Sequence, residues 1–153
     1  MKKITVLGGG MMGSAIAIDL SSNYSVEVID LKHNKELKNR FNQLNIKTTL
    51  ADLTDFKLLN QLTKDADLVI GAVPGYIGFK VLKNAIKAGK NIVDISFFSE
   101  DPFQLNELAQ RKNLTAVVDC GVSPGLSNLI LGYHNKKMKV EFFKCLVGGL
   151  PFK

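Results

Sequence analysis

The sequence predicts an α/β fold, in which a doubly wound parallel sheet of six strands carries helices on both faces. Two observations support this prediction. Short β-rich apolar runs alternate with helical patterns along the whole chain, and a glycine-rich turn follows the first run. The chain has 153 residues, 46% of them hydrophobic, so one ordinary domain can bury a substantial core. Right-handed crossovers then predict the strand order 3-2-1-4-5-6.

The first half of the chain predicts three strand–helix pairs. Small side chains after the first glycine turn suit a helix packed closely on a sheet, and Val26 and Val28 alternate with Glu27 as in a strand. Asn34 can cap the second helix. The expected strands are residues 3–8, 24–30 and 45–50, and the expected helices are residues 11–22, 34–44 and 53–65.

The second half repeats the pattern. "DLVIGAV" is a nearly continuous apolar run, as expected for a strand buried on both faces. Asp101, Pro102 and Gln104 have the spacing of a capped helix start. The expected strands are residues 67–73, 91–95 and 114–120, and the expected helices are residues 75–90 and 101–113.

The glycine turn "VLGGGMMG" indicates a dinucleotide site of the Rossmann type, because it follows a strand and opens a helix. Gly8 permits the tight turn, Gly10 lets the backbone approach a pyrophosphate, and Gly13 lets the helix pack on the strand. Met11 and Met12 begin the helix whose free backbone N–H groups would hold the diphosphate.

Asp30 supplies the second part of this motif, since it ends the second strand 20 positions after Gly10. A carboxylate here accepts hydrogen bonds from ribose hydroxyls and repels a 2′-phosphate, which favours NAD over NADP. Leu31 follows it beside the adenosine. Lys32 and His33 could offset part of the repulsion, so use of NADP is also possible.

Further cofactor residues are predicted from the geometry of open α/β sheets, which bind ligands at the carboxyl ends of their strands. Ala72, Val73 and Pro74 leave the fourth strand and should lie beside the nicotinamide ribose. Asp52 follows the third strand. It either binds the adenine amine or caps the helix at residues 53–65, and the sequence does not separate these interpretations.

Composition argues against several other classes of protein. The net charge of +6 comes from scattered lysines, without the interleaved aromatic residues of a nucleic-acid platform. No apolar stretch approaches a membrane span of about 20 residues. Cys120 and Cys145 lack metal-site spacing and are expected to be reduced, buried thiols, and no metal site is predicted. His33 and His134 are interpreted as surface or structural residues.

The N-terminus could also be interpreted as a secretory signal, because "MKK" precedes an apolar run and Ala15 and Ala17 resemble a cleavage site. Cleavage after Ala17 would remove the central strand and the glycine turn, yet leave Asp30 at the spacing that they require. We therefore expect a cytoplasmic protein.

Four strings of the sequence resemble the saccharopine dehydrogenase-like family, in particular its lysine 6-dehydrogenase branch: "GGGMMG", "VDISFF", "DCGVSPGLSN" and "VGGLP". The resemblance covers essentially the whole chain. It implies a nicotinamide-dependent oxidoreductase that acts on the carbon–nitrogen bond of an amino acid such as lysine or saccharopine. Hydride would pass from the amine-bearing carbon to the nicotinamide, and water would hydrolyse the resulting imine.

The resemblance also implies roles for two loops. Ser96 and Phe97 would border the nicotinamide and the substrate. The loop after the sixth strand would face the substrate, and Asp119 in it is the single catalytic candidate, orienting or polarising an amine. "SPG" is equally compatible with an ordinary helix-entry turn. The implied substrate residues are Asp119, Gly121, Pro124 and Gly125.

Domain organisation is expected to be residues 1–135 for the dinucleotide-binding domain and 136–153 for the start of a substrate and dimerisation domain. "MKVEFFKCLVGG" is predicted to be the first strand of that second domain, whose remainder is missing. We expect a truncated product, a broken reading frame or half of a split enzyme. The alternative function is a stand-alone NAD(H)-binding module, possible also as a homodimer or other homo-oligomer paired through its last strands.

Overall fold

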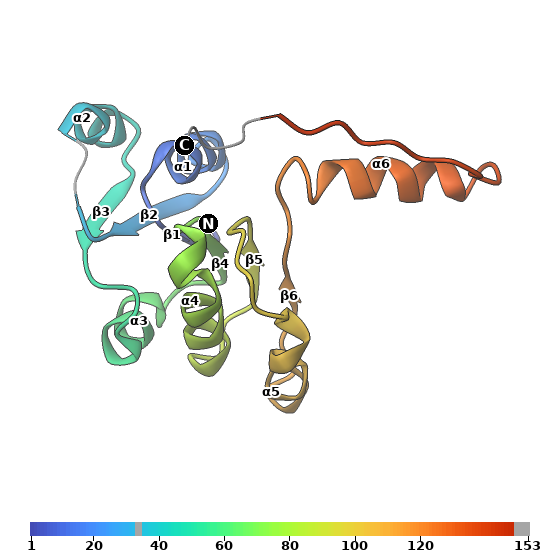
Figure 1. The fold of residues 1–153 in the computed structure, drawn as a ribbon. Coiled ribbons are helices and arrows are strands. Elements are labelled where there is room, and N and C mark those ends of the chain that lie inside the picture. Colours follow the sequence, from blue (N-terminus) through green and yellow to red (C-terminus); the bar gives the residue numbers. More distant parts are fainter. Residues whose placement is uncertain (33–34, 149–153) are drawn as a thin grey trace.

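A six-stranded parallel sheet forms the centre of the computed structural model, which describes residues 1–32 and 35–148 (Figure 1). Its order is β3-β2-β1-β4-β5-β6, so the predicted fold class and strand order are confirmed. Every neighbouring pair is parallel. The strands are β1 (Lys3–Leu7), β2 (Ser25–Asp30), β3 (Lys47–Leu50), β4 (Leu68–Gly71), β5 (Ile92–Asp94) and β6 (Ala116–Val117).

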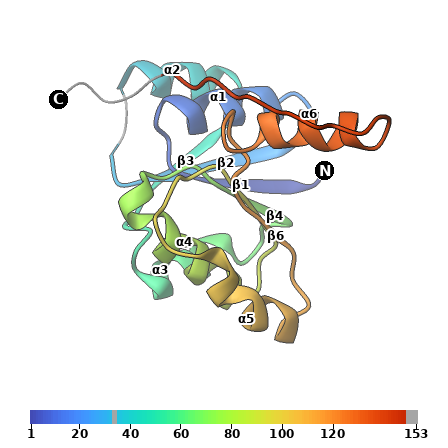
Figure 2. The same cartoon turned by 45° about the vertical axis from the view of Figure 1, so that its right-hand side comes forward.

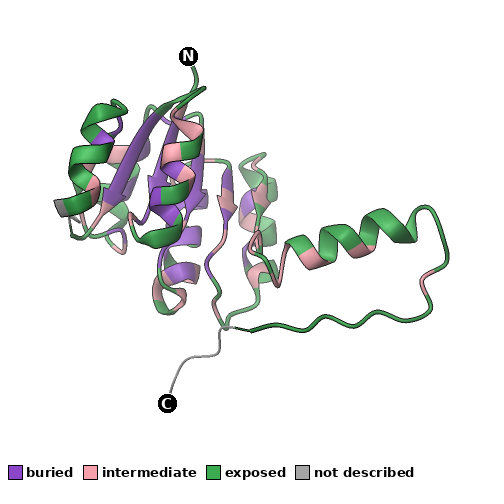
Figure 3. Ribbon diagram, turned by 90° about the horizontal axis from the view of Figure 1, so that it is seen from above, coloured by how far each residue is buried: buried purple, intermediate pink, exposed green. Residues whose placement is uncertain are grey.

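Helices cover both faces of the sheet (Figure 2). One face carries α1 (Met11–Leu20) and α2 (Lys35–Gln43). The other carries α3 (Phe56–Thr63), α4 (Gly75–Lys87), the 3₁₀ helix η1 (Pro102–Leu105) and α5 (Asn106–Arg111). A last helix, α6 (Leu126–Asn135), extends away from the sheet, and the chain that follows it turns and runs back alongside the helix (Figures 1 and 3).

Two apolar clusters hold these layers together. Val6 and Val28 pack with Ala17 of α1 on one face of the sheet. On the other face, Val69 and Leu82 belong to the cluster beneath α3, α4 and α5. Because strands in such a sheet are buried on both sides, the consecutive β4 residues Val69, Ile70 and Gly71 are all buried, as predicted for the apolar run "DLVIGAV".

One charged side chain, Glu27 of β2, lies within the sheet at 2% exposure. Burial alone would raise its pKa, but the hydrogen bond from the Thr49 hydroxyl and the ammonium groups of Lys47 and Lys3 lower it overall. Lys47 lies 3.0 Å and Lys3 3.4 Å from the carboxylate. The ion pairs join β2 to both neighbouring strands, β1 and β3.

The structure corrects several boundaries. The strand expected at 114–120 has only two residues, because it is the sheet edge and Asp119 adopts a positive φ of 57° just after it. The helix expected at 101–113 is divided between η1 and α5. The strand predicted at 138–149 is wrong for its described part, residues 138–148, because that backbone pairs with no strand.

The local predictions had mixed outcomes. Asp101 does cap the predicted helix start, since its carboxylate accepts the Phe103 N–H at 2.9 Å. The cap at Asn34 and the role of His33 lie outside the described residues. The expectation of buried thiols is wrong for Cys145, which is exposed on the segment after α6, and Cys120 is only half-buried; neither forms a disulfide.

Candidate functional site: a cleft at the carboxyl edge of the sheet

A cleft of about 580 Å³ runs along the carboxyl edge of the sheet. Its volume falls within the range of roughly 300–1,000 Å³ typical of small-molecule sites. The exits of five strands, β1 to β5, contribute to its lining, together with the beginnings of α1 and α4. This is where parallel α/β sheets place their ligands, at the point where the strand order reverses between β1 and β4.

The glycine turn forms one wall of this cleft. Gly8 has a φ of +104°, and a Cβ there would lie 2.4 Å from the carbonyl oxygen of Ala72. A Cβ on Gly13 would lie 1.9 Å from the carbonyl oxygen of Gly8, so α1 packs directly against the turn. Both positions therefore require glycine for steric reasons, and together they fix where the helix begins.

Gly10 differs from its neighbours because a Cβ there would meet no atom within 4 Å. The space left by this glycine opens onto the cleft, and Gly10 is the N-cap of α1 without a side chain to occupy the first N–H groups. Those backbone donors at the positive end of a ten-residue helix suit a diphosphate. The residues present therefore fit a dinucleotide pyrophosphate.

Asp30 stands at the end of β2, half-buried beside the glycine turn. One carboxylate oxygen accepts the N–H of Gly9, and the other accepts the N–H of Lys32 at 3.0 Å. Each carboxylate oxygen has two acceptor positions, so hydroxyl donors can still bind. The turn and the carboxylate are thus fixed relative to each other on the cleft wall.

The structure tests one of the two interpretations of Asp52, that of a helix cap. The cap of α3 is Asp55, whose carboxylate accepts the N–H groups of Lys57 and Leu58. Asp52 instead accepts the Thr54 N–H at 2.8 Å, lies exposed on the cleft, and has a lowered pKa because of that backbone hydrogen bond first and the Thr54 hydroxyl second. The helix-cap interpretation of Asp52 is therefore wrong, and an adenine contact stays a prediction.

The opposite end of the cleft is formed by the exits of β4 and β5. A Cβ on Gly75, the first residue of α4, would lie 1.8 Å from the carbonyl oxygen of Phe97. A Cβ on Gly78 would lie 2.9 Å from the Ser96 Cβ. The loop after β5 therefore packs tightly on the first turns of α4, with Ser96 buried and Phe97 76% exposed.

Asp94, the last residue of β5, is fully buried just behind this loop. Its Oδ1 accepts the Ser96 N–H at 2.7 Å, and its Oδ2 has no hydrogen-bond partner among the described residues. Burial raises its pKa to about 6, against the effect of the Ser96 hydrogen bond, and the nearby charge of Asp119 adds to the increase. The same two aspartates, after burial itself, raise the pKa of the Cys120 thiol.

The loop after β6 lies outside the lining of the cleft. Asp119 is exposed, and Gly121 bridges to Gly125, where a Cβ would lie 2.1 Å from the Gly121 carbonyl oxygen. Gly125 has a φ of +128°, which residues with a side chain rarely adopt, so the backbone conformation alone explains the glycine at this position. The substrate role of Asp119, Gly121, Pro124 and Gly125 stays a prediction.

The structure brings together all the predicted cofactor residues except Gly13, which packs beneath the turn. Sequence reasoning gave no cleft position to several further lining residues. Tyr76, which is 87% exposed at the start of α4, could have been found from its place two residues after Pro74. Lys32, which the sequence had placed near the ribose, also lines the cleft, and the additional lining residues are Ala51, Leu53, Tyr76, Ile77 and Ile95.

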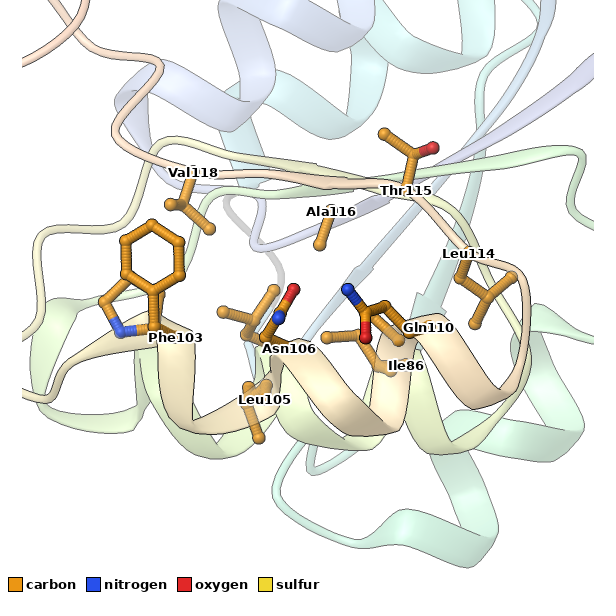
Figure 4. A pocket seen from close by; sticks show the side chains of 12 residues that line it. Ile86, Phe103, Leu105, Asn106, Gln110, Leu114, Thr115, Ala116 and Val118 are labelled. Atoms are coloured by element: carbon orange, nitrogen blue, oxygen red, sulfur yellow. The ribbon is translucent and has the colours of Figure 1, made fainter.

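A second cavity, of about 340 Å³, lies between α4, α5 and β6 (Figure 4). Its lining is mostly apolar, and its polar side chains are those of Asn106, Gln110 and Thr115, none of which titrates. Within residues 1–32 and 35–148, no cluster of three or more potential metal ligands occurs, and no helix is long and apolar enough to cross a membrane. The cleft is therefore the candidate site.

Comparison with known proteins agrees with this site. The model of the saccharopine dehydrogenase NADP-binding domain matches residues 4–117, which include the glycine turn, Asp30 and all of the sheet except Lys3. The chain belongs to this family. Its fold thus corresponds to the dinucleotide-binding portion of saccharopine dehydrogenase-like oxidoreductases.

Three relatives show how far the family likeness extends. The saccharopine dehydrogenase (NADP(+), L-glutamate-forming) of Schizosaccharomyces pombe is 30% identical over 70% of this chain and 25% of its own length. The corresponding Saccharomyces cerevisiae protein is 24% identical over 98% of this chain and 35% of its own. The apo L-glutamate-forming enzyme structure from S. cerevisiae matches with a TM-score of 0.77 and 23% identity, over 90% of this chain and 31% of that one. The chain therefore spans about a quarter to a third of these relatives.

Proposed function

We propose that this chain is the NAD-binding part of an oxidoreductase that acts on the CH–NH bond of an amino acid of the lysine or saccharopine type. The observation that carries the cofactor assignment is the Asp30 carboxylate, hydrogen-bonded to the glycine turn on the cleft wall. The family assignment supports the reaction class, because its members in the comparison are saccharopine dehydrogenases.

The proposed preference for NAD differs from the cofactor named for the two relatives, which is NADP(+). Asp30 places a carboxylate at the end of β2, where the adenosine ribose of a dinucleotide is bound in this fold. A 2′-phosphate beside that carboxylate would meet like charge and lose a hydroxyl donor. Lys32 lines the same part of the cleft and reduces this penalty without removing it.

The chain's own groups bind and orient the cofactor. The first N–H groups of α1 hold the diphosphate, Asp30 holds the ribose, and the exits of β4 and β5 border the nicotinamide end. When bound, a nicotinamide dinucleotide supplies hydride chemistry. Ser96 and Phe97 shield that end of the cleft from one side and set the place where a substrate carbon must approach.

A second function, a dinucleotide-binding module without turnover of its own, is favoured by a different observation. Helix α6 buries none of its residues, and Asp119, the catalytic candidate, is exposed outside the cleft. Neither α6 nor the loop after β6 contributes a residue to the lining of the cleft. In this second function, substrate contacts would come from another chain or segment.

Calorimetric titration with NADH and NADPH tests the cofactor assignment. We expect NADH to bind with a dissociation constant at least about tenfold lower than that of NADPH, a difference of roughly 1.4 kcal/mol. Absence of binding by both cofactors at millimolar concentration would refute the proposed function. Tighter binding of NADPH would refute the role given to Asp30.

Absorbance of reduced nicotinamide, followed after lysine or saccharopine is added with NAD⁺, separates the two functions. An enzyme complete in this chain gives steady formation of NADH that depends on the amino acid. A binding module gives cofactor binding without turnover, which is the result expected from the exposure of Asp119.

A further inference from the structure

We propose that Asp94 is a positioning residue for the redox end of the cleft, where it holds the loop of residues 95–98 so that Ser96 and Phe97 border the nicotinamide. This inference rests on the proposed function, because the loop has a ligand to border only if the cleft binds a dinucleotide. Asp94 itself is fully buried and does not line the cleft. It therefore acts through the residues that it holds.

Asp94 joins three strand exits through three contacts of its own and one made by the next residue, Ile95. Its Oδ1 accepts the Ser96 N–H at 2.7 Å, which fixes the first turn of the loop after β5. Its main-chain carbonyl accepts the Cys120 N–H at 3.1 Å, from the loop after β6. On the other side, Gly71 of β4 is its register partner, and the Ile95 N–H donates to the Gly71 carbonyl at 2.9 Å.

The Asp94 carboxyl also occupies space that β4 leaves open for it. A Cβ on Gly71 would lie 1.8 Å from Asp94 Oδ2, so a larger residue there would displace the carboxyl. Two glycines of α4, Gly75 and Gly78, admit the same loop from the opposite side. The loop is therefore held between α4 and the Asp94 carboxyl, with little freedom to shift.

Burial of the Asp94 carboxyl group lowers the stability of the folded protein. Asp94 Oδ2 is buried without a hydrogen-bond partner among the described residues, and burial disfavours its charged form. The titratable groups that face it are Asp119 and Cys120, both after β6, while Gly71 to Pro74 of the β4 exit and Gly75 and Gly78 of α4 carry none. A group that lowers stability beside a ligand cleft is the pattern expected of a functional residue.

The position of Asp94 predicts an effect confined to one end of the ligand. Strands β2 and β5 are separated by β1 and β4, which places their ends about 14 Å apart at the usual strand spacing. Asp30 lies at the end of β2 and Asp94 at the end of β5. Loss of Asp94 should therefore weaken nicotinamide contacts and leave the adenosine, ribose and diphosphate contacts unchanged.

The test compares two probes, NADH and ADP-ribose, which share everything except the nicotinamide. They are titrated calorimetrically into the full chain and into Asp94→Ala and Asp94→Asn. The matched control is Asp101→Ala, because Asp101 also accepts the N–H of the residue two positions on, at 2.9 Å, but is exposed outside the cleft. Thermal unfolding of each variant, with its circular dichroism spectrum, verifies that the fold is retained.

We expect Asp94→Ala to weaken NADH binding about fivefold, the equivalent of one hydrogen bond, with ADP-ribose binding unchanged. Asp94→Asn keeps the Oδ1 acceptor and should recover most of that loss near pH 7.5. Protonated Asp94 also keeps an Oδ1 acceptor, so the ratio of NADH to ADP-ribose affinity should stay constant between about pH 5 and 7.5 in both the unmodified chain and Asp94→Asn. ADP-ribose serves as the pH control.

Equal weakening of both probes by Asp94→Ala would overturn the inference, since it would indicate general loss of structure. Unchanged binding of both probes would overturn it as well. If the unmodified chain binds neither probe, the proposed function itself fails, and the two failures are thereby distinguishable. Should Asp94→Ala not fold, Gly71→Ala decides the question, because its Cβ would displace the Asp94 carboxyl and should change the ratio of NADH to ADP-ribose affinity in the same direction.

Discussion

Asp30 and Asp94 end two strands of the same sheet and make the same local hydrogen bond, in which Oδ1 accepts the N–H of the residue two positions on. They differ in what the second oxygen meets. In Asp30 it accepts the Gly9 N–H on the cleft wall, whereas in Asp94 it has no partner among the described residues and is fully buried. The same turn therefore serves a group that can reach a ligand and a group that can act only through its neighbours.

This difference shows that strand-end aspartates cannot be assigned a role from sequence position alone. Each stands where a parallel sheet collects its functional residues. Burial and the neighbouring strand decide the outcome: Gly71 makes room for the Asp94 carboxyl on β4, and Gly9 offers a backbone donor to Asp30. Four sets of substitutions can break or sharpen the contrast.

The largest effect is expected at Gly13, which supports the turn that Asp30 binds. Gly13→Ala places a Cβ 1.9 Å from a backbone oxygen, and we expect it to lower the free energy of unfolding by about 3 kcal/mol. Gly10→Ala meets no atom within 4 Å and should leave stability nearly unchanged, yet weaken NADH binding by about tenfold or more because the methyl group enters the diphosphate space. Urea denaturation and calorimetry measure the two effects. Equal stability of the two variants would contradict the packing described for α1.

The next largest effect is the pH dependence of stability at Asp94. Its folded-state pKa of about 6 exceeds the ordinary value of 3.8, so its stabilising protonation is complete below pH 4 and is lost as the pH rises through 6. Relative to Asp94→Asn, the unmodified chain should lose roughly 2 kcal/mol of stability between pH 4 and 7.5. Denaturant midpoints at several pH values provide the measurement.

A further variant sharpens this pH experiment. Asp119→Asn removes one of the causes of the raised Asp94 pKa. It should therefore reduce the loss of stability between pH 4 and 7.5 that distinguishes the unmodified chain from Asp94→Asn. If the difference in stability between the unmodified chain and Asp94→Asn does not change with pH, Asp94 has an ordinary pKa in the folded protein. That result would contradict the effect expected from its burial and from the missing hydrogen-bond partner of its Oδ2.

A smaller effect is expected at Asp30, on cofactor choice. Asp30→Asn keeps an oxygen acceptor for the Lys32 N–H and removes the charge that opposes a 2′-phosphate. The ratio of NADPH to NADH affinity should rise about tenfold, with most of the change in NADPH. Competitive titration of the two cofactors measures this ratio. A ratio that does not move would mean that the carboxylate is not beside the ribose.

The smallest effect compares Asp52 with Asp55, which are three residues apart. Asp52→Ala should weaken NADH binding by only about twofold to fivefold, because a single exposed hydrogen bond to adenine is lost. Asp55→Ala should leave affinity unchanged but cost about 1 kcal/mol of stability, since it removes the cap of α3. Reversed outcomes in affinity and thermal unfolding would contradict the assignment of the two side chains.

Much of the fold could be predicted from sequence because its determinants are local. Alternating apolar runs gave the six strands, and the handedness of crossovers gave their order. The glycine spacing and Asp30 predicted one wall of the cleft, and the exit of β4 predicted another part. These inferences need only periodicity and the rule that parallel strands end at one edge.

The remaining features depend on contacts that no local pattern contains. In the sequence, Asp94 is indistinguishable from an ordinary residue at a strand end. Its contact with Gly71 depends on the register between β4 and β5, which the sequence does not show. The segment 138–148 has the apolar alternation of a strand, but strand formation requires a hydrogen-bonding neighbour, and the described residues provide none. Asp52 was a possible cap only because the helix was expected to begin at residue 53, whereas it begins at Phe56 and Asp55 caps it.

The most direct test of the account is the ratio of NADH to ADP-ribose affinity, measured by calorimetry in Asp30→Ala and Asp94→Ala. The account predicts that Asp30→Ala weakens both ligands equally, so that the ratio is preserved. It predicts that Asp94→Ala weakens NADH alone, so that the ratio changes about fivefold. The same ratio in both variants would contradict the separation of the cleft into a ribose end that Asp30 contacts and a redox end that Asp94 positions.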